Sequence, residues 1–385
     1  MQKNSIVTKI ASRQPASDIY LVNGTAGAYH GLDRMIDLMG QRGWRYYRSQ
    51  SLSNNRGLNG LIGANDTIII KVNSQWDQRG GPNTDLLKAL IRTIAEHPDG
   101  FKGEIIVADN GQDQYGSGGK GGSLNWSQNN AVDITQSVQR VVDSFQGYRV
   151  SAYLWDKITN TQVKEYSNGD NDDGYIVAAQ RAQKNGFLIS YPKFQTKHGT
   201  LISLKNGIWN PETRQYASDS LKLINLPTLK SHFIYGVTAC VKHYMGVVSD
   251  KLTAKLGSRS HDLVGAGGMG TEIAGVRYPA LNLLDATWVN AKPAGGPWTP
   301  FDAATMGDVI VAGLDPVAID YWAAKNILMP LAREAGYPDL SPIDPDNVAE
   351  KTFGRWLRLA MEELNSAGYS TTVDEQRMNV FVAES

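Results

Sequence analysis

Short apolar runs alternate along the chain with longer stretches in which apolar residues recur at helical spacing. The runs 18–24, 66–73 and 103–111 are rich in β-branched and aliphatic residues, as expected of strands buried on both faces. A helix is predicted to follow the second run and to begin near Asn83 or Thr84, because both residues are good N-caps. This alternation is typical of βαβ units. The sequence therefore predicts an α/β fold with a mostly parallel, Rossmann-like sheet flanked by helices.

The middle of the chain departs from this pattern in two places. Residues 112–135 are polar and rich in glycine, which predicts a long loop that is either a lid or a surface excursion. Residues 145–217 contain short runs separated by turns, among them a hairpin with its turn at His198 and Gly199. We therefore expect a smaller antiparallel β insertion.

The α/β pattern resumes with strands predicted at 221–227 and 281–289. Between them a helix is predicted at 235–248, because apolar residues recur there at helical spacing. These residues are Val237, Cys240, Val241, Tyr244 and Val248. Lys242 and His243 belong to the same predicted helix.

The C-terminal third is predicted to begin with a strand, turn and helix at 307–327, in which Asp315 is placed to cap the helix and Pro316 to open it. A helix with one apolar face and a last strand follow. The apolar residues of that helix are Val348, Phe353, Trp356, Leu357, Ala360 and Leu364. The predicted units are a first part of the α/β domain (18–144), the insertion (145–217), a second part of the α/β domain (218–330), and a C-terminal helix with a terminal strand (331–385).

Composition narrows the class of protein. Lys and Arg together number 38, as do Asp and Glu, so the net charge is zero and a nucleic-acid partner is not expected. Cys240 is the single cysteine, which excludes an intramolecular disulfide and an iron–sulfur cluster ligated by this chain. No apolar run reaches the ~20 residues that span a bilayer, and the first residues lack the apolar core of a signal peptide. We expect a soluble, cytoplasmic protein; an exported mature form and any protein partner stay open.

Charged and polar side chains follow the predicted strands. In open parallel sheets, ligands bind beyond the carboxyl ends of the strands. We therefore expect these groups to meet at one rim: Lys71, Asn73, Asp109, Asn110, Lys230, His232, Asp285 and Asp315. Three of them have structural alternatives, because Asp315 is also suited to capping a helix, Asp109 to forming an Asx turn and Lys71 to reaching the sheet's end.

The stretch 225–262 carries three of the six histidines, together with Lys230 and Lys242. A positive pocket of this kind suits a small anionic molecule. Its lysines and histidines are suited to acid–base catalysis, and lysine also to Schiff-base chemistry. The spacing of His232, His243 and His261 matches no compact zinc signature, so the metal content is unknown and a divalent metal held by the three stays open.

Several blocks of the chain, taken in order, resemble domain-of-unknown-function family 362. The likeness extends over about residues 18–330, in IIIKVN, VADNG, NLPTLKSHFIYGVTACVKHYMGVV, the later His261, LLDATWV and VIVAGLDPVAIDYWAAK. The chain departs from the family pattern in having Val72 where proline is usual, Ser231 where threonine is usual and His243 where asparagine is usual. Many members carry ferredoxin-like cysteine segments, which this chain lacks.

The sequence thus predicts an enzyme that acts on a small anionic metabolite through an anion-binding pocket rich in lysine and histidine, at the carboxyl ends of the strands. The alternative is a ligand- or cofactor-binding accessory protein of a redox system, without catalysis of its own. The predicted catalytic residues are Lys230, His232, Lys242, His243 and His261. The predicted ligand-binding residues are Lys71, Asn73, Asp109, Asn110 and Asp315.

Overall fold

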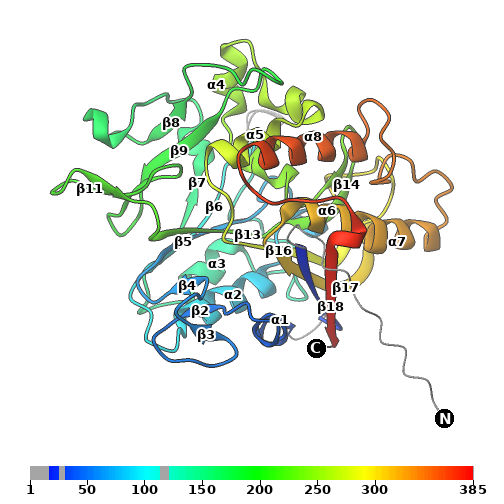
Figure 1. The fold of residues 1–385 in the computed structure, drawn as a ribbon, viewed down its shortest axis with the longest axis horizontal. Coiled ribbons are helices and arrows are strands. Elements are labelled where there is room, and N and C mark those ends of the chain that lie inside the picture. Colours follow the sequence, from blue (N-terminus) through cyan, green and yellow to red (C-terminus); the bar gives the residue numbers. More distant parts are fainter. Residues whose placement is uncertain (1–16, 26–30, 113–120, 385) are drawn as a thin grey trace.

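A twisted, ten-stranded sheet runs through the computed structural model, which describes residues 17–25, 31–112 and 121–384 (Figure 1). The strands of this part of the chain are β1 (Ser17–Asn23), β5 (Thr67–Lys71), β6 (Glu104–Asp109), β7 (Val150–Leu154), β13 (Leu221–Asn225), β14 (Thr228–His232), β15 (Gly236–Thr238), β16 (Leu281–Asn290), β17 (Thr305–Gly313) and β18 (Met378–Glu384). Their order is β18-β1-β17-β16-β13-β5-β6-β7, with β14 paired to β16 and β15 paired to β14.

Most neighbouring strands are parallel. The run β16-β13-β5-β6-β7 is parallel throughout, whereas β17 is antiparallel to both β16 and β1. These pairings confirm the predicted α/β fold with a mostly parallel sheet. Because β17 is reversed, its carboxyl end lies at the opposite edge of the sheet from the carboxyl ends of β5, β6 and β13.

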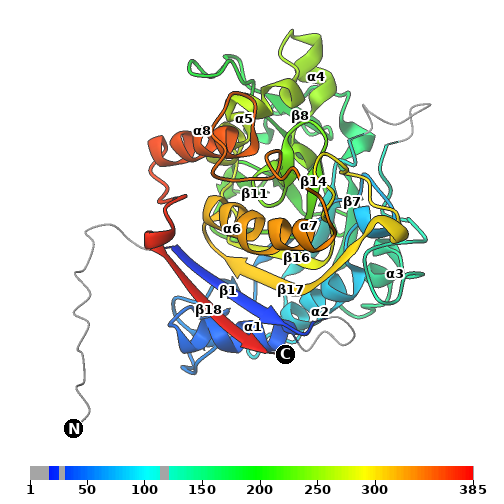
Figure 2. The same ribbon diagram turned by 90° about the vertical axis from the view of Figure 1, so that its right-hand side faces the viewer.

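Helices cover both faces of the sheet (Figure 2). One face carries α1 (Gly31–Gln41), α2 (Thr84–Ala95) and α3 (Val138–Asp143). The other carries α5 (Gly268–Gly275), α6 (Pro316–Ala323), α7 (Met329–Glu334) and α8 (Phe353–Ser366). Alternation along β5 explains this sandwich, since Ile68 and Ile70 pack in the first core and Ile69 in the second. The short α4 (Asp250–Lys255) lies beside the antiparallel part of the fold in Figure 1.

A separate five-stranded antiparallel sheet contains the predicted hairpin. It consists of β8 (Gly174–Val177), β9 (Ser190–Gln195), β10 (Leu201–Ser203), β11 (Gly207–Asn210) and β12 (Gln215–Ala217). The described elements place β7 in the main sheet, so the antiparallel strands begin later than the start of the predicted insertion. A small third sheet is formed by β2 (Tyr47–Arg48), β3 (Arg56–Gly57) and β4 (Ile62–Gly63).

The predicted loop at 112–135 is described only in part, because 113–120 lie outside the described residues, as do residues 1–16. The part from 121 to 135 is irregular and packs against the segment that follows β5 and against β16. Trp126 Nε1 donates to Ser74 O at 2.7 Å, and Asn130 Nδ2 donates to Asp285 Oδ2 at 2.7 Å. Its role as a lid stays a prediction.

The helix predicted at 235–248 is wrong. This segment forms β15, then a turn and the 3₁₀ helix η6 (Lys242–Gly246). Asp320 on α6 accepts the backbone N–H groups of Cys240 and Val241 at 2.7 and 2.9 Å and so fixes the turn. The apolar residues of the segment are buried on all sides, so their spacing reflects burial and not a helical face.

The C-terminal elements agree with the sequence except at one residue. The apolar positions predicted from Phe353 to Leu364 are buried on α8. Val348 precedes the helix and is 52% exposed, so its predicted place on the apolar face is wrong.

Asp315 caps a helix, as the sequence allowed. Its Oδ1 accepts the N–H groups of Val317 and Ala318 at 2.9 and 3.1 Å, and its Oδ2 accepts from Ser17 Oγ at 2.6 Å and Thr372 N at 2.9 Å. The carboxylate therefore joins α6 to β1 and to the segment before β18.

We predict that Asp315→Ala lowers the free energy of unfolding by about 2 kcal/mol, because it leaves the first turn of α6 and Thr372 N without their acceptor. Urea denaturation measures this loss. Asp302→Ala, at an exposed position, serves as the control and should change the free energy by less than about 0.5 kcal/mol. Equal losses in the two variants would contradict the capping role.

Candidate functional site

A cavity of about 360 Å³ lies where β5, β6 and the β14–β15 hairpin end. All five residues predicted as catalytic line it, together with three of those predicted to bind a ligand. These eight residues are Lys71, Asn73, Asp109, Lys230, His232, Lys242, His243 and His261. The structure therefore brings together side chains that are up to 190 positions apart in the sequence.

The hairpin supplies two of these side chains from one strand. Lys230 and His232 are alternate residues of β14, so both side chains point to the same face. They pair with Thr238 and Gly236 on β15, and Thr238 also lines the cavity. Lys230 and His232 are 2% and 3% exposed, so they form part of the cavity's floor.

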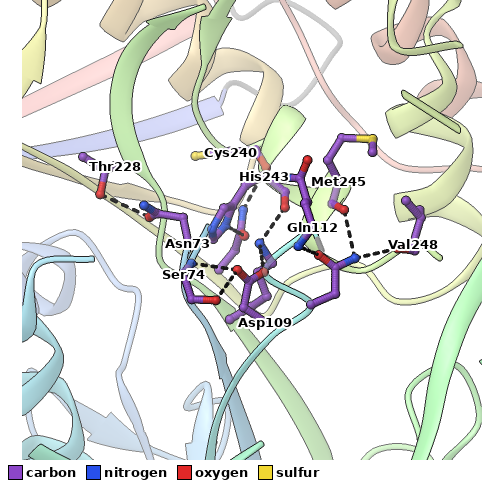
Figure 3. A network of polar contacts seen from close by, with 12 residues as sticks. Asn73, Ser74, Asp109, Gln112, Thr228, Cys240, His243, Met245 and Val248 are labelled. Carbon is purple, nitrogen blue, oxygen red and sulfur yellow. Dashed lines mark hydrogen bonds and ion pairs between the residues drawn. The ribbon is translucent and has the colours of Figure 1, made fainter. Parts of the chain in front are cut away.

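A buried ion pair connects the ends of β5 and β6. Lys71 Nζ lies 2.9 Å from Asp109 Oδ1, and the two side chains are 2% and 3% exposed. Ser74 donates its backbone N–H and its hydroxyl to Asp109 Oδ2 at 2.7 and 2.9 Å, contacts that Figure 3 shows. Lys71 Nζ also donates to the carbonyl of His243 at 2.7 Å. Burial lowers the pKa of Lys71, and the charge of Asp109 opposes this effect.

The ion pair and Asn110 together hold η6 against the sheet. Asn110 donates its backbone N–H to Gly246 O at 3.1 Å and its amide to Met245 O and Val248 O at 3.2 and 2.5 Å. Asn110 does not line the cavity, although the sequence predicted it to bind a ligand. A Cβ at Gly246 would overlap both Asp109 Oδ1 and Lys71 Nζ, so the close approach requires glycine there.

His243 is oriented by side-chain amides. Its Nδ1 lies 2.7 Å from Asn225 Oδ1. Asn225 Nδ2 donates to Cys240 O and to Asn282 Oδ1 at 3.0 and 2.9 Å, and Asn282 Nδ2 donates to Leu314 O at 3.2 Å. These carbonyls fix the amides, so Nδ1 of His243 carries the proton and Nε2 presents a lone pair. Nε2 is buried and has no hydrogen-bond partner in the described residues.

His232 has the opposite tautomer. Its Nδ1 accepts the backbone N–H groups of Ile234 and Tyr235 at 3.1 and 3.2 Å, so the proton of the neutral ring is on Nε2. Burial, and secondarily Lys242, lowers the pKa of His232. Burial and nearby lysines also lower the pKa of His243, which the Val72 carbonyl opposes in part. At neutral pH the site therefore presents one imidazole acceptor and one imidazole donor.

Lys230 and Lys242 have no carboxylate within ion-pair distance in the described residues. Lys230 Nζ donates to Gly80 O at 2.5 Å, and Lys242 Nζ lies 5.6 Å from the centroid of the Tyr235 ring. Burial lowers the pKa of Lys230 to about 7, with a further contribution from Lys242. Burial likewise lowers the pKa of Lys242 to about 7, with a contribution from Lys71.

His261 and Asn73 complete the predicted set at the cavity. His261 belongs to the 3₁₀ helix η7 (Ser260–Ala266), and its ring centroid lies 6.0 Å from that of His232. Burial lowers the pKa of His261 to about 3. Asn73 donates to Gly80 O at 2.9 Å and so helps to fix the loop that Lys230 contacts. No group of three or more His, Cys, Asp or Glu side chains in the described ranges is placed to hold a metal ion.

Two of the predicted strand-end carboxylates lie elsewhere. Asp315 faces a different, smaller cavity because β17 runs in the opposite direction. Asp285 is buried, and it accepts hydrogen bonds from Asn83 and Asn130 without lining the main cavity. The prediction of one common rim is therefore right for the side chains at the ends of β5 and β6 and on the β14 hairpin. It is wrong for Asp285, which lies in the middle of β16, and for Asp315, which follows the reversed β17.

Two groups of residues at the site were not predicted from the sequence. Asn225 is the last residue of β13 and could have been found with the other strand ends, and Asn282 is a polar residue inside an apolar strand. The aromatic mouth of the cavity gave no such signal, because its residues come from three separate segments. They are Trp76, Phe233 and Trp298, with Ile234 beside them.

We predict that Gly246→Ala destabilises the protein by about 1–3 kcal/mol, since the added methyl group has to displace the Lys71–Asp109 pair. Chemical denaturation provides the measurement. Gly265→Ala is the matched control, because a Cβ there meets only a ring carbon of Tyr235 at an ordinary 3.7 Å. If Gly246→Ala were as stable as the control, the ion pair would not pack against η6 as described.

The comparisons with known proteins concern the second half of the chain. The model of a family described as "Domain of unknown function (DUF362)" matches residues 210–325. The matched residues include β13 to β16 and all five predicted catalytic side chains, and the match confirms the family resemblance there. No curated protein and no solved structure matches the chain. No helix in the described part of the chain has the length and apolar character needed to cross a membrane.

Proposed function

Residues 210–325 belong to the DUF362 family, and from the cavity that they form with β5 and β6 we propose an enzyme that binds a small anionic molecule and moves a proton to or from it. Lys230 and Lys242 hold the anion, His243 accepts the proton and His232 donates one. The alternative, an accessory protein that binds a ligand or cofactor, uses the same lysines without turnover.

The main support for this proposal is the excess of positive charge on the floor of the cavity. Three lysines line the cavity and one of them, Lys71, has Asp109 as its partner. Burying an ammonium group without a counter-charge is costly, and an anion between Lys230 and Lys242 removes that cost. A small dianion suits this arrangement better than a cation, which the lysines would repel.

The histidines support proton transfer. His243 offers a lone pair and His232 an N–H, and both rings are held in these states by uncharged hydrogen-bonding groups. An anion bound to the lysines reduces the positive field at His243 and so raises its basicity. A base and an acid at one anion site are what proton abstraction and return require.

We predict that sulfate binds the cavity more tightly at pH 6 than at pH 8.5. Sulfate keeps its charge over this range, whereas the two lysines lose their protons above about pH 7. The affinity should therefore fall by up to about tenfold per pH unit for each lysine. The other titratable or charged side chains that line the cavity are Lys71, Asp109, His232, Tyr235, His243, Arg259, His261 and Asp262.

Isothermal titration calorimetry with sulfate at both pH values, on the wild-type protein and on Lys242→Gln, tests this expectation. The variant should bind sulfate at least tenfold more weakly at pH 6 and should show a shallower pH dependence. Lys255→Gln changes an exposed lysine of α4 and should leave both unchanged. An affinity that rises with pH, or equal effects of the two substitutions, would refute the anion site.

We further predict that the protein exchanges a carbon-bound hydrogen of a small 2-hydroxy or 2-oxo acid with deuterium from solvent, detected by NMR in D₂O. His243→Gln should slow this exchange by at least 100-fold. It should leave sulfate affinity within about threefold, because the lysines remain. His198→Gln, at an exposed turn, is the control. Tight anion binding with no exchange of any acid in the panel would favour the accessory protein.

A further inference from the structure

The cavity changes character between its floor and its mouth. The floor side chains Lys230, His232, Lys242 and His243 are at most 4% exposed. At the mouth, Phe233, Ile234 and Trp298 are 52%, 48% and 46% exposed. Large apolar side chains gathered at the rim of a pocket are typical of a ligand-binding surface.

The rings form a continuous wall from floor to mouth. His232 stacks on Phe233 with ring centroids 5.2 Å apart and planes 7° apart. Phe233 lies 5.8 Å from Trp298, and Trp298 lies 6.0 Å from Trp76. The wall thus connects a donor imidazole at the buried end with indole rings at the surface.

Backbone contacts hold this wall in place. Phe233 N donates to Gly296 O at 2.9 Å, and Gly296 N donates to Ser231 Oγ at 3.2 Å. Asn290 Nδ2 donates to Trp298 O at 3.1 Å, which fixes the loop beyond β16 beside β14. A wall fixed in this way loses little conformational entropy when a flat group packs against it.

We propose that the ligand is an anion that carries an aromatic or similarly flat apolar group, and that Phe233 and Trp298 select it. The anionic end reaches Lys230 and Lys242, and the ring packs on the aromatic wall. This inference rests on the proposed anion site, because the lysines give the ligand its orientation. The volume of about 360 Å³ is sufficient for a compact ligand of this kind.

Phenylphosphonate and methylphosphonate test the inference, because they share one anionic group and differ in the apolar part. The wild-type protein should bind phenylphosphonate at least tenfold more tightly in isothermal titration. Phe233→Ala and Trp298→Ala should each reduce this preference to about threefold or less while leaving the methylphosphonate affinity unchanged. Lys242→Gln should weaken both ligands and keep the preference.

Tyr148→Ala removes an exposed aromatic ring that does not line the cavity and is the control, which should retain the full preference. Equal affinities in the wild-type protein, or a preference that survives both aromatic substitutions, would overturn the inference and leave the anion site intact. If neither phosphonate binds, the anion site is refuted and the inference fails with it. If Phe233→Ala and Trp298→Ala change the oligomeric mass of the protein and not its preference for phenylphosphonate, the inference is overturned and the mouth of the cavity is a protein interface.

Discussion

The buried ion pair between Lys71 and Asp109 fixes the position of η6 and of the side chains that η6 brings to the candidate site. Removing two charges from water costs several kcal/mol for each ion, so such a pair is tolerated only when its remaining hydrogen bonds are made. Ser74 completes the set for Asp109, and the His243 carbonyl does so for Lys71. The second contact anchors η6 to the sheet, and η6 carries both Lys242 and His243. The ion pair therefore positions the side chains of Lys242 and His243 indirectly, through the backbone of η6.

With Lys71 neutralised, the electrostatics of the cavity depend on Lys230 and Lys242. Burial lowers the pKa of each to about 7, with a further contribution from Lys242 at Lys230 and from Lys71 at Lys242. A lowered pKa reduces the cost of burying two ammonium groups, because the neutral amine is easier to bury. In the proposed function, an anion would favour the charged forms of the same two side chains and so couple its binding to proton uptake.

Much of the fold and part of the site could be predicted from the sequence. The β-branched runs, the N-cap at Asn83 and the rule that ligands meet strand ends were sufficient to place Lys71, Asp109 and Lys230 together. The direction of β17 could not be predicted, because an apolar run does not indicate whether a strand is parallel or antiparallel. Nor could the turn before η6, since Asp320 is 80 residues away and its hydrogen bonds to Cys240 N and Val241 N are tertiary contacts.

His243 is oriented by side-chain amides and not by a carboxylate, and this difference matters because lysines surround the ring. A carboxylate at the position of Asn225 would also hold Nδ1–H, but it would raise the pKa of the ring and bring negative charge close to Lys71 and Lys230. The amides of Asn225 and Asn282 hold the tautomer without adding charge. His232 is held by backbone N–H groups, which are neutral as well. Both histidines are therefore oriented without negative charge beside the lysines, as the proposed anion site requires.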